Sequence, residues 1–399
     1  MEIRSMFNQI FGKQKNQQSQ QYTKMEMLNN YMSQFYNFGR DIFADENVRA
    51  CIDTIARNVA KTKATAIGAN NNKLNYLLSI RPNQCMSAYD MFYKTITQLY
   101  INNNSFILIQ KDNNDVITGF YPVNSSSVDF LESMGYIFVQ FTFHNGKKVT
   151  VSYDDIVHLR RFFNRNDMYG DSNDAILNTL SLSSTVNQGL ANAITTSHNL
   201  KGILKYTGSL KPEDLKKQKD MFVADFANIN NAGGIAALDS KVEYQQLKVE
   251  PVTAEHEQMT IVEEKIYKYF GLNKKIIMGD FDEDVFNSFY ESIIEPLLIQ
   301  LSSEFTHKCF TERERGFGNR IEFSGNRLNY ASNSTKVAMI KELLPYSVFT
   351  INEARQLFNL ESVEGGDIRI QTLNVVNADK ANEYQIGEKV NKEKEGEQQ

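Results

Sequence analysis

The residues best suited to chemistry in this sequence are carboxylates that crowd one short loop. Asp280, Asp282 and Asp284 alternate along it, and Glu291 follows. This spacing matches positions 1, 3, 5 and 12 of a calcium-binding loop, which binds the ion through oxygen atoms. Position 6 of such a loop needs glycine for its turn, but here it is Val285, where a helical apolar pattern begins. The sequence therefore favours a helix start, and we expect no metal, with the three aspartates as the nearest approach to a ligand set.

Two basic residues, Lys274 and Lys275, precede the acidic loop, which also contains Glu283. Lysines at this place could touch phosphate groups of a nucleic acid that passes by. The alternative is that they are surface lysines beside a helix C-terminus, where the helix dipole favours cations. The sequence leaves both interpretations open.

Enzymatic patterns are missing from the sequence. It has no Gly-x-x-x-x-Gly-Lys-Ser/Thr loop for nucleotide hydrolysis, and its five histidines include no pair at metal-binding spacing. His158 lies in a strand pattern beside Arg160, which favours a structural role over that of a base. Three widely spaced cysteines predict reduced thiols. We expect a protein that is not an enzyme and needs no cofactor.

Bulk composition sets further limits. The net charge of −5 argues against a protein that grips nucleic acid through a basic face. No apolar run reaches the roughly 18 residues that span a bilayer, so we expect a soluble cytoplasmic protein with no membrane partner.

The element that must position the acidic loop is a long helix predicted from Val285 to Phe310. Apolar residues recur there at three- and four-residue steps, and Pro296 should kink the helix. Before it, helical spacing over 48–60 and 87–100 flanks a turn at 77–83. Alternating patterns predict strands at 105–110, 116–121, 136–143, 148–152 and 156–160, with a hairpin turn at Asn145-Gly146. The fold class is therefore α+β.

The second half of the chain predicts a small module held between two helices. Residues 173–200 and 253–270 read as helices, and residues 201–250 as a β-α-β-β unit in which 234–238 pairs with 242–247. A strand at 320–323 and short helices at 335–344 and 351–360 follow. Residues 1–44 and 368–399 are expected to be a flexible arm and a largely disordered tail.

Ten short segments in this order resemble the portal proteins of tailed bacteriophages, the head-to-tail connectors. One of them is Tyr169-Gly170-Asp171-Ser172, and another is Glu295-Pro296-Leu297-Leu298. The others lie at 48–56, 77–83, 102–106, 121–123, 155–160, 233–235, 278–280 and 363–367. The resemblance covers the chain from about residue 48 to residue 367.

The resemblance implies a portal-type architecture. Residues 45–172 would form the wing, together with the long kinked helix and a strand at 287–330. Residues 173–200 and 251–270 would be the two stem helices, and 201–250 the clip between them. Residues 271–286 would be the tunnel loop, here short and acidic where relatives often have a longer Ser-, Gly-, Asn- and Tyr-rich loop, and 331–367 a helical crown.

The resemblance also implies a function. The chain would form a ring, typically a dodecamer, at one capsid vertex of the virion after assembly in the host cytoplasm. Double-stranded DNA would pass through it during packaging and ejection. Other expected partners are the terminase large subunit, a head-tail adaptor, and a major capsid or scaffolding protein.

Specific residues follow from the implied layout. Lys274, Lys275, Asp280, Asp282, Glu283 and Asp284 would face the channel. Clip docking or subunit contacts would involve Tyr206, Met221, Phe222, Phe226 and Tyr244, for which local core packing is the alternative. Two polar sets fit a channel wall that does not hold DNA tightly: Ser181, Ser183, Ser184, Thr185 and Asn187, and the carboxylates Glu255, Glu257, Glu263 and Glu264. Both sets could equally be the solvated faces of two amphipathic helices.

Two other classes remain open from the residues alone. One is a DNA-processing enzyme of a mobile element, which would cleave plasmid DNA in the presence of metal. The other is a non-phage scaffold with the same layout, which would assemble without a packaging partner.

Overall fold

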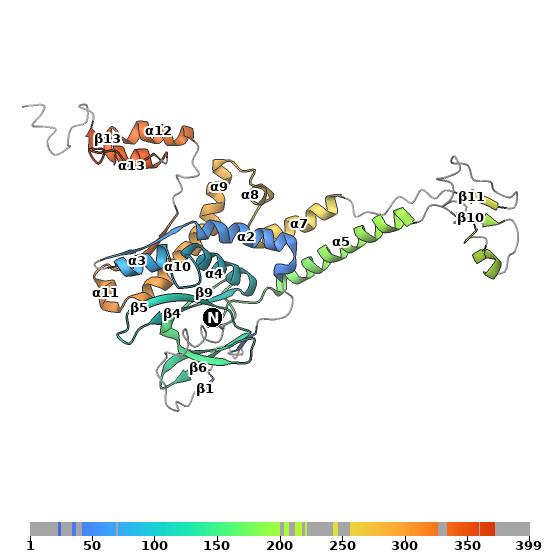
Figure 1. Ribbon diagram of the computed structural model, residues 1–399, viewed down its shortest axis with the longest axis horizontal. Coiled ribbons are helices and arrows are strands. Elements are labelled where there is room, and N and C mark those ends of the chain that lie inside the picture. The colour runs from blue at the N-terminus through green and yellow to red at the C-terminus, as the bar shows by residue number, and fades with distance from the viewer. Residues whose placement is uncertain are drawn as a thin grey trace, which may run out of the picture. The chain divides into compact units, whose positions relative to one another are not determined.

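The computed structural model (Figure 1) divides the chain into two units. It describes residues 23–24, 34–36, 42–68, 71–199, 203–206, 212–217, 220–221, 242–245, 256–325, 333–358 and 360–371. The first unit contains residues 1–40, 50–171 and 271–399, and the second contains residues 41–49 and 172–270.

A three-stranded antiparallel sheet lies in the first unit. Its central strand β4 (Asn104–Lys111) is flanked by β5 (Ile117–Val123) and β9 (Ile156–Arg160). The first six residues of β4 are buried, which fits a central strand covered on both faces. All three strands confirm the sequence prediction.

A second antiparallel sheet is built around β6 (Ser127–Ser133), β7 (Tyr136–Thr142) and β8 (Lys148–Ser152). The predicted turn between β7 and β8 is confirmed, with Gly146 at φ +77°. Sequence analysis missed β6. It also assigned all of residues 1–44 to a flexible arm, whereas β1 (Thr23–Lys24) and β2 (Gln34–Tyr36) both pair with β6.

Three α-helices lie in the described chain between residues 45 and 103: α2 (Glu46–Ala60), α3 (Asn72–Ser79) and α4 (Ala88–Asn102). The predicted turn at 77–83 is wrong in its first three residues, which end α3. Ser87 caps α4, since its side chain accepts a hydrogen bond from the Asp90 N–H. Between α2 and α3, β3 (Lys63–Ile67) pairs with β12 (Arg320–Ser324), a long-range partner that local patterns do not reveal.

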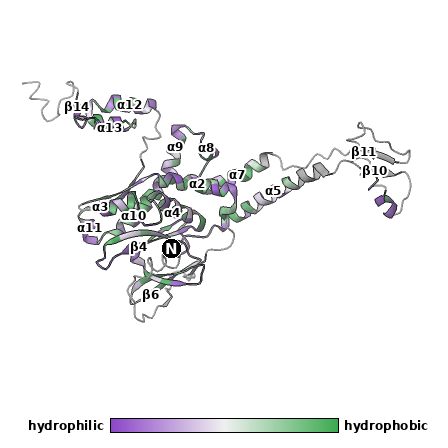
Figure 2. Cartoon of the chain, viewed as in Figure 1, coloured by the Kyte–Doolittle hydropathy of each residue, from purple (hydrophilic) through white to green (hydrophobic). Residues whose placement is uncertain are grey.

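The predicted long helix is divided into α9 (Glu283–Phe289), a π-helical turn η4 (Tyr290–Ile294) and α10 (Glu295–Cys309). α10 packs against β9 and β12, and α4 packs against β4. Figure 2 shows hydrophobic positions along both helices. Phe305 of α10 is fully buried, with ring centroids 5.4 Å from Phe120 and 5.6 Å from Phe323. These rings join helix and strands in one core.

The remaining described elements of the first unit are short. They are the helices α8 (Lys274–Met278) and α11 (Glu312–Gly316), and, near the C-terminus, α12 (Asn333–Leu343), β13 (Tyr346–Thr350), α13 (Ile351–Gln356) and β14 (Arg369–Gln371). The segment expected to be a helical crown (331–367) also contains a strand, β13, which pairs with β14 beyond the end of that segment, so regular structure extends to residue 371.

The second unit contains the two predicted stem helices, α5 (Asp174–Asn199) and α7 (His256–Phe270), which lie side by side. Its strands β10 (Ile203–Tyr206) and β11 (Val242–Gln245) pair with each other. Residues 242–245 therefore pair with 203–206, and the predicted strand at 234–238 lies outside the described residues. Helical backbone at 212–217 and 220–221 agrees with the predicted module helix.

Candidate functional site: the acidic loop, its groove and the paired helices

The acidic loop is shorter than the sequence suggested, because two capped helices enclose it. Asn273 accepts a hydrogen bond from the Ile276 N–H and starts α8, which ends at Gly279 with φ +75°. Asp282 accepts a hydrogen bond from the Val285 N–H at 2.8 Å and starts α9. Only residues 279–282 remain between the two helices.

The helix caps involve the same carboxylates that matched the calcium-loop pattern. The Asp282 carboxylate is engaged in capping, and Asp284 lies in the first turn of α9, where carboxylates favour the positive end of the helix dipole. The described part of the chain holds no cluster of three His, Cys, Asp or Glu side chains that could bind a metal ion. Lys274 and Lys275 begin α8 and are exposed.

A groove of about 370 Å³ opens between α8, α9 and η4. Its floor is apolar, formed by Leu272, Ile276, Val285 and Phe289, while Asp284 stands at its exposed wall. Sequence analysis did not find this groove, because it depends on the angle between two short helices.

The π-turn explains how the long helix accommodates Pro296. The Glu295 N–H bonds to the Tyr290 carbonyl in the wide π pattern, and Pro296 follows in the first turn of α10, where its missing N–H costs little. The predicted irregularity is present, but the π-turn begins six residues before the proline. Gly271 makes this arrangement possible, since a Cβ there would collide with Ile293 of η4.

Within the described side chains of α5, the exposed ones are mostly polar and carry no charge beyond Asp174 in the first turn, and Leu182 is also exposed. Ser181, Ser184, Thr185, Asn187 and Gln188 are exposed, and the 26-residue helix contains no lysine or arginine. Ser183 is a correction to the predicted bore residues, because it is buried beside Val262 of α7 at a cavity of about 60 Å³.

The carboxylates expected on the neighbouring helix behave differently from one another. Glu264 is exposed and lies 4.0 Å from the Lys268 amine, and Glu263 lines the same small cavity as Ser183. Glu257 lies in α7, whereas Glu255 falls outside the described residues. The described exposed face of α7 therefore carries both signs of charge.

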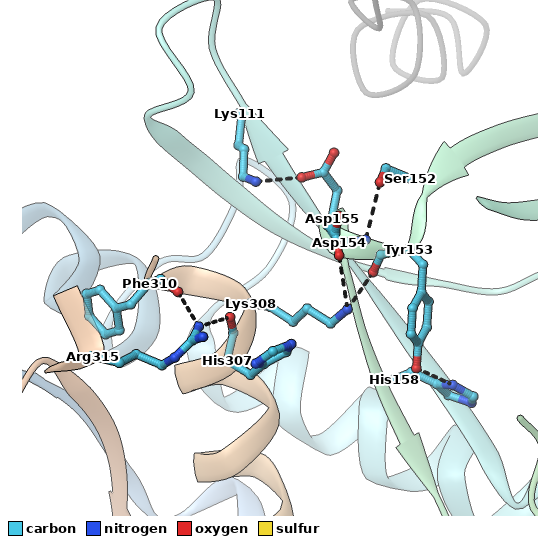
Figure 3. Close-up of polar contacts among 10 residues, drawn as sticks. All are labelled: Lys111, Ser152, Tyr153, Asp154, Asp155, His158, His307, Lys308, Phe310 and Arg315. Carbon is cyan, nitrogen blue, oxygen red and sulfur yellow. Dashed lines mark hydrogen bonds and ion pairs between the residues drawn. The ribbon is translucent and has the colours of Figure 1, made fainter. Parts of the chain in front are cut away.

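His158 has a structural environment (Figure 3). It is fully buried and stacks on Phe106 with a centroid distance of 4.3 Å. Since Asn104 Oδ1 accepts the Gly170 N–H, it must also accept from His158 Nε2, leaving Nδ1 to accept the Tyr153 hydroxyl at 3.4 Å. Burial, together with the charges of Arg160 and Lys308, holds the pKa of His158 well below 6.5. A neutral imidazole without solvent access is no general base.

Lys308 completes this polar cluster. Its only signal in the sequence is weak, a lysine next to the apolar face of a helix. Its amine donates to the Tyr153 carbonyl at 2.8 Å and lies 3.9 Å from the Tyr153 ring centroid. Burial lowers the pKa of Lys308 and raises the pKa of Tyr153 to about 12. Lys308 thus ties α10 to the turn before β9.

The predicted clip residues are only partly described. Tyr206 lies opposite Val242, and Tyr244 opposite Leu204, in the β10–β11 pair. Met221 is 66% exposed, while Phe222 and Phe226 lie outside the described residues.

Comparison with solved structures identifies the same fold in the necks of gene transfer agent particles. The neck protein of an empty gene transfer agent (GTA) particle with C6 symmetry is 17% identical, with a TM-score of 0.62 over 81% of this chain and 93% of that chain. The neck of the native particle with C12 symmetry gives 18% identity and a TM-score of 0.54, over 80% of this chain and 92% of that chain. At these identities the likeness concerns the fold alone.

Sequence comparison supplies the family. The chain is 25% identical over 186 residues to the probable portal proteins of Lactococcus phages p2 and SK1. This match covers 44% of the chain, which spans about half the length (49%) of these curated relatives. The model of the phage portal protein family matches residues 46–359, and the chain belongs to that family.

The resemblance and the α+β fold class are thus confirmed. The family is one of structural proteins. Within the described residues, no helix combines the length and the apolarity that crossing a bilayer requires.

Proposed function

We propose that this chain forms the portal ring at one capsid vertex and serves as the channel through which double-stranded DNA enters and leaves. The observation that carries this proposal is α5, which contains no lysine or arginine and whose described exposed side chains are mostly polar. At 1.5 Å per residue such a helix is about 39 Å long. DNA carries one charge per about 1.7 Å, so a cationic wall of this length would bind phosphates tightly and slow transport. A wall rich in serine and threonine does not bind DNA phosphates through opposite charge in this way.

The ring is homo-oligomeric in this proposal, most simply a dodecamer, which the C12 symmetry of one fold relative supports. The module at 201–250 would dock the terminase large subunit and later a head-tail adaptor, with exposed Met221 as one contact. The first unit would meet the major capsid or scaffolding protein during assembly in the host cytoplasm. The chain would have no catalytic activity of its own.

Electron microscopy of the purified recombinant protein tests the ring directly. We expect uniform rings with a central hole wide enough for duplex DNA, whose class averages count the subunits. A protein that stays monomeric or dimeric at high concentration, or that cleaves plasmid DNA with added metal, would refute the proposal.

The channel wall can be tested by adding charge. Ser184→Arg with Gln188→Arg places two cations one turn apart on the exposed face of α5. We expect rings to form normally but to retain DNA in a gel-shift assay, with lower packaging. Ser184→Gln with Gln188→Glu is the matched control, and equal DNA retention by both variants would contradict a channel-facing α5.

The lysines that begin α8 have a separate role in this proposal, as transient phosphate contacts. Reversing both charges, Lys274→Glu with Lys275→Glu, should change packaging efficiency or DNA retention without blocking ring assembly. Unchanged packaging by intact rings would refute this contact.

A further inference from the structure

An aromatic-cation pair lies at the end of β9 in the first unit, with the half-buried Arg160 as its cation. Phe163 is 50% exposed, and the guanidinium of Arg160 lies 4.1 Å from its ring centroid. The adjacent Phe162 is 45% exposed with φ +53°, an unusual conformation that is held by a hydrogen bond from the Asp171 N–H to its carbonyl. The chain thus maintains a strained turn that presents two phenyl rings to the surface.

The groove between α8, α9 and η4 has the complementary character. Its apolar floor suits an aromatic side chain, and its volume of about 370 Å³ leaves room for more than a ring alone. Asp284 is exposed at the wall, and its carboxylate forms no ion pair within the described part of the chain. An arginine beside an inserted ring would find its counter-charge there.

A closed ring of more than two identical chains requires two different, complementary patches on each chain. We infer that the Arg160–Phe163 pair of one copy inserts into the groove of the next copy, with Phe163 on the apolar floor and Arg160 against Asp284. The inference rests on the proposed ring and assigns one of its subunit contacts. Opposite charge and the match of an apolar knob to an apolar groove both favour a second copy as the occupant.

Covalent trapping tests the contact without altering it. Asn164→Cys, beside the pair, is combined with Ser288→Cys, in the groove, in a Cys85→Ser background that removes the exposed native thiol. With a short bismaleimide, we expect a ladder of covalent oligomers on a denaturing gel, because each copy links to the next. Either cysteine alone should give no ladder.

Assembly of the untreated sample is measured first by electron microscopy. Intact rings with no ladder, or with only an intrachain bond, would overturn this inference and leave the portal proposal standing. Absence of rings in the parent protein would overturn both. A Ser288→Cys thiol that reacts fully in rings and becomes protected only when DNA is added would assign the groove to nucleic acid and also overturn the inference.

A charge exchange supplies the second test. Arg160→Asp and Asp284→Arg should each reduce the fraction of chains in rings by about tenfold, as Phe163→Ala should, while the double exchange restores assembly. Phe317→Ala is the matched control, since Phe317 is 77% exposed with Arg313 at 5.9 Å from its ring. Circular dichroism confirms folding of each variant. Failure of the double exchange to restore rings, with all variants folded, would overturn the contact.

Discussion

The buried histidine gives the structure a measurable pH dependence. His158 is neutral in the folded protein, because burial and the charges of Arg160 and Lys308 hold its pKa well below 6.5. In the unfolded chain the same imidazole titrates with a pKa of about 6.5. The unfolded state therefore binds one more proton than the folded state at pH values below about 6.5, so stability is present above this pH and is lost as the pH falls.

The size of the loss follows from the unfolded pKa. At pH 7.5 the imidazole of the unfolded chain is mostly neutral. Its protonation therefore lowers the free energy of unfolding by about 0.1 kcal/mol or less. At pH 5.0 the corresponding cost reaches at most about 2 kcal/mol, the value for a folded imidazole that stays neutral, and its slope is at most about 1.4 kcal/mol per pH unit. That loss is a large part of the stability of an ordinary domain.

The assay is urea unfolding of parent and variant at both pH values, followed by far-ultraviolet circular dichroism at one protein concentration. His158→Gln removes the titrating group and keeps an N–H that can donate to Asn104. We expect the variant to be less stable at pH 7.5 but to lose up to about 2 kcal/mol less than the parent between the two pH values. His144→Gln, at an exposed turn, is the control and should retain the parental pH dependence. An equal pH dependence in parent and His158→Gln would refute the assignment of a neutral, buried imidazole.

Four further substitutions probe packing, each measured by urea unfolding. Phe305→Ala should cost about 3–5 kcal/mol, because it empties the site shared with Phe120 and Phe323; a cost below about 1 kcal/mol would disprove this core. Gly170→Ala should cost about 1–3 kcal/mol or more, since its Cβ would lie 2.5 Å from the Asn103 carbonyl oxygen, whereas Gly189→Ala, which meets nothing within 4 Å in α5, should stabilise by about 0.5–1 kcal/mol. Equal changes in stability for Gly170→Ala and Gly189→Ala would contradict the close approach of residue 170 to the Asn103 carbonyl. Lys308→Met should change stability by less than about 1.5 kcal/mol, since the lost hydrogen bond to Tyr153 is offset by the removed cost of burying a cation; a loss above about 3 kcal/mol would show that the bond dominates.

Local patterns predicted most helices and strands of this chain because their signals are local. The β7–β8 hairpin follows from alternation around Asn145-Gly146, and α4 follows from apolar spacing behind its Ser87 cap. The buried face of α9 and α10 also follows the predicted stripe, from Phe286 to Phe305. In each case the residues that decide the structure lie within a few positions of one another.

The elements that were missed depend on distant partners. β3 is a short run after a helix, and its pairing with β12 comes from residues more than two hundred and fifty positions away. β1 and β2 lie in a polar segment whose composition predicts disorder, yet both pair with the edge of β6. The groove beside Asp284 and the burial of Ser183 likewise depend on how helices meet, which periodicity does not contain.

The distribution of charge over the two units predicts two different responses to salt. α5 has no lysine or arginine, and the two lysines of α7, Lys265 and Lys268, are outnumbered by its three glutamates, so the proposed channel wall has little with which to hold phosphate. A protein with 6–10 phosphate contacts loses about 10³–10⁵-fold in DNA affinity between about 50 and 200 mM salt, and we expect less than about tenfold for assembled rings. The subunit contact, in contrast, includes the Arg160–Asp284 pair, which salt should weaken where it is exposed. Ring fraction and DNA retention measured on the same samples across this range separate the two effects. DNA retention that falls steeply with salt while the rings persist would mean that cations line the channel, and α5 would then not be its wall.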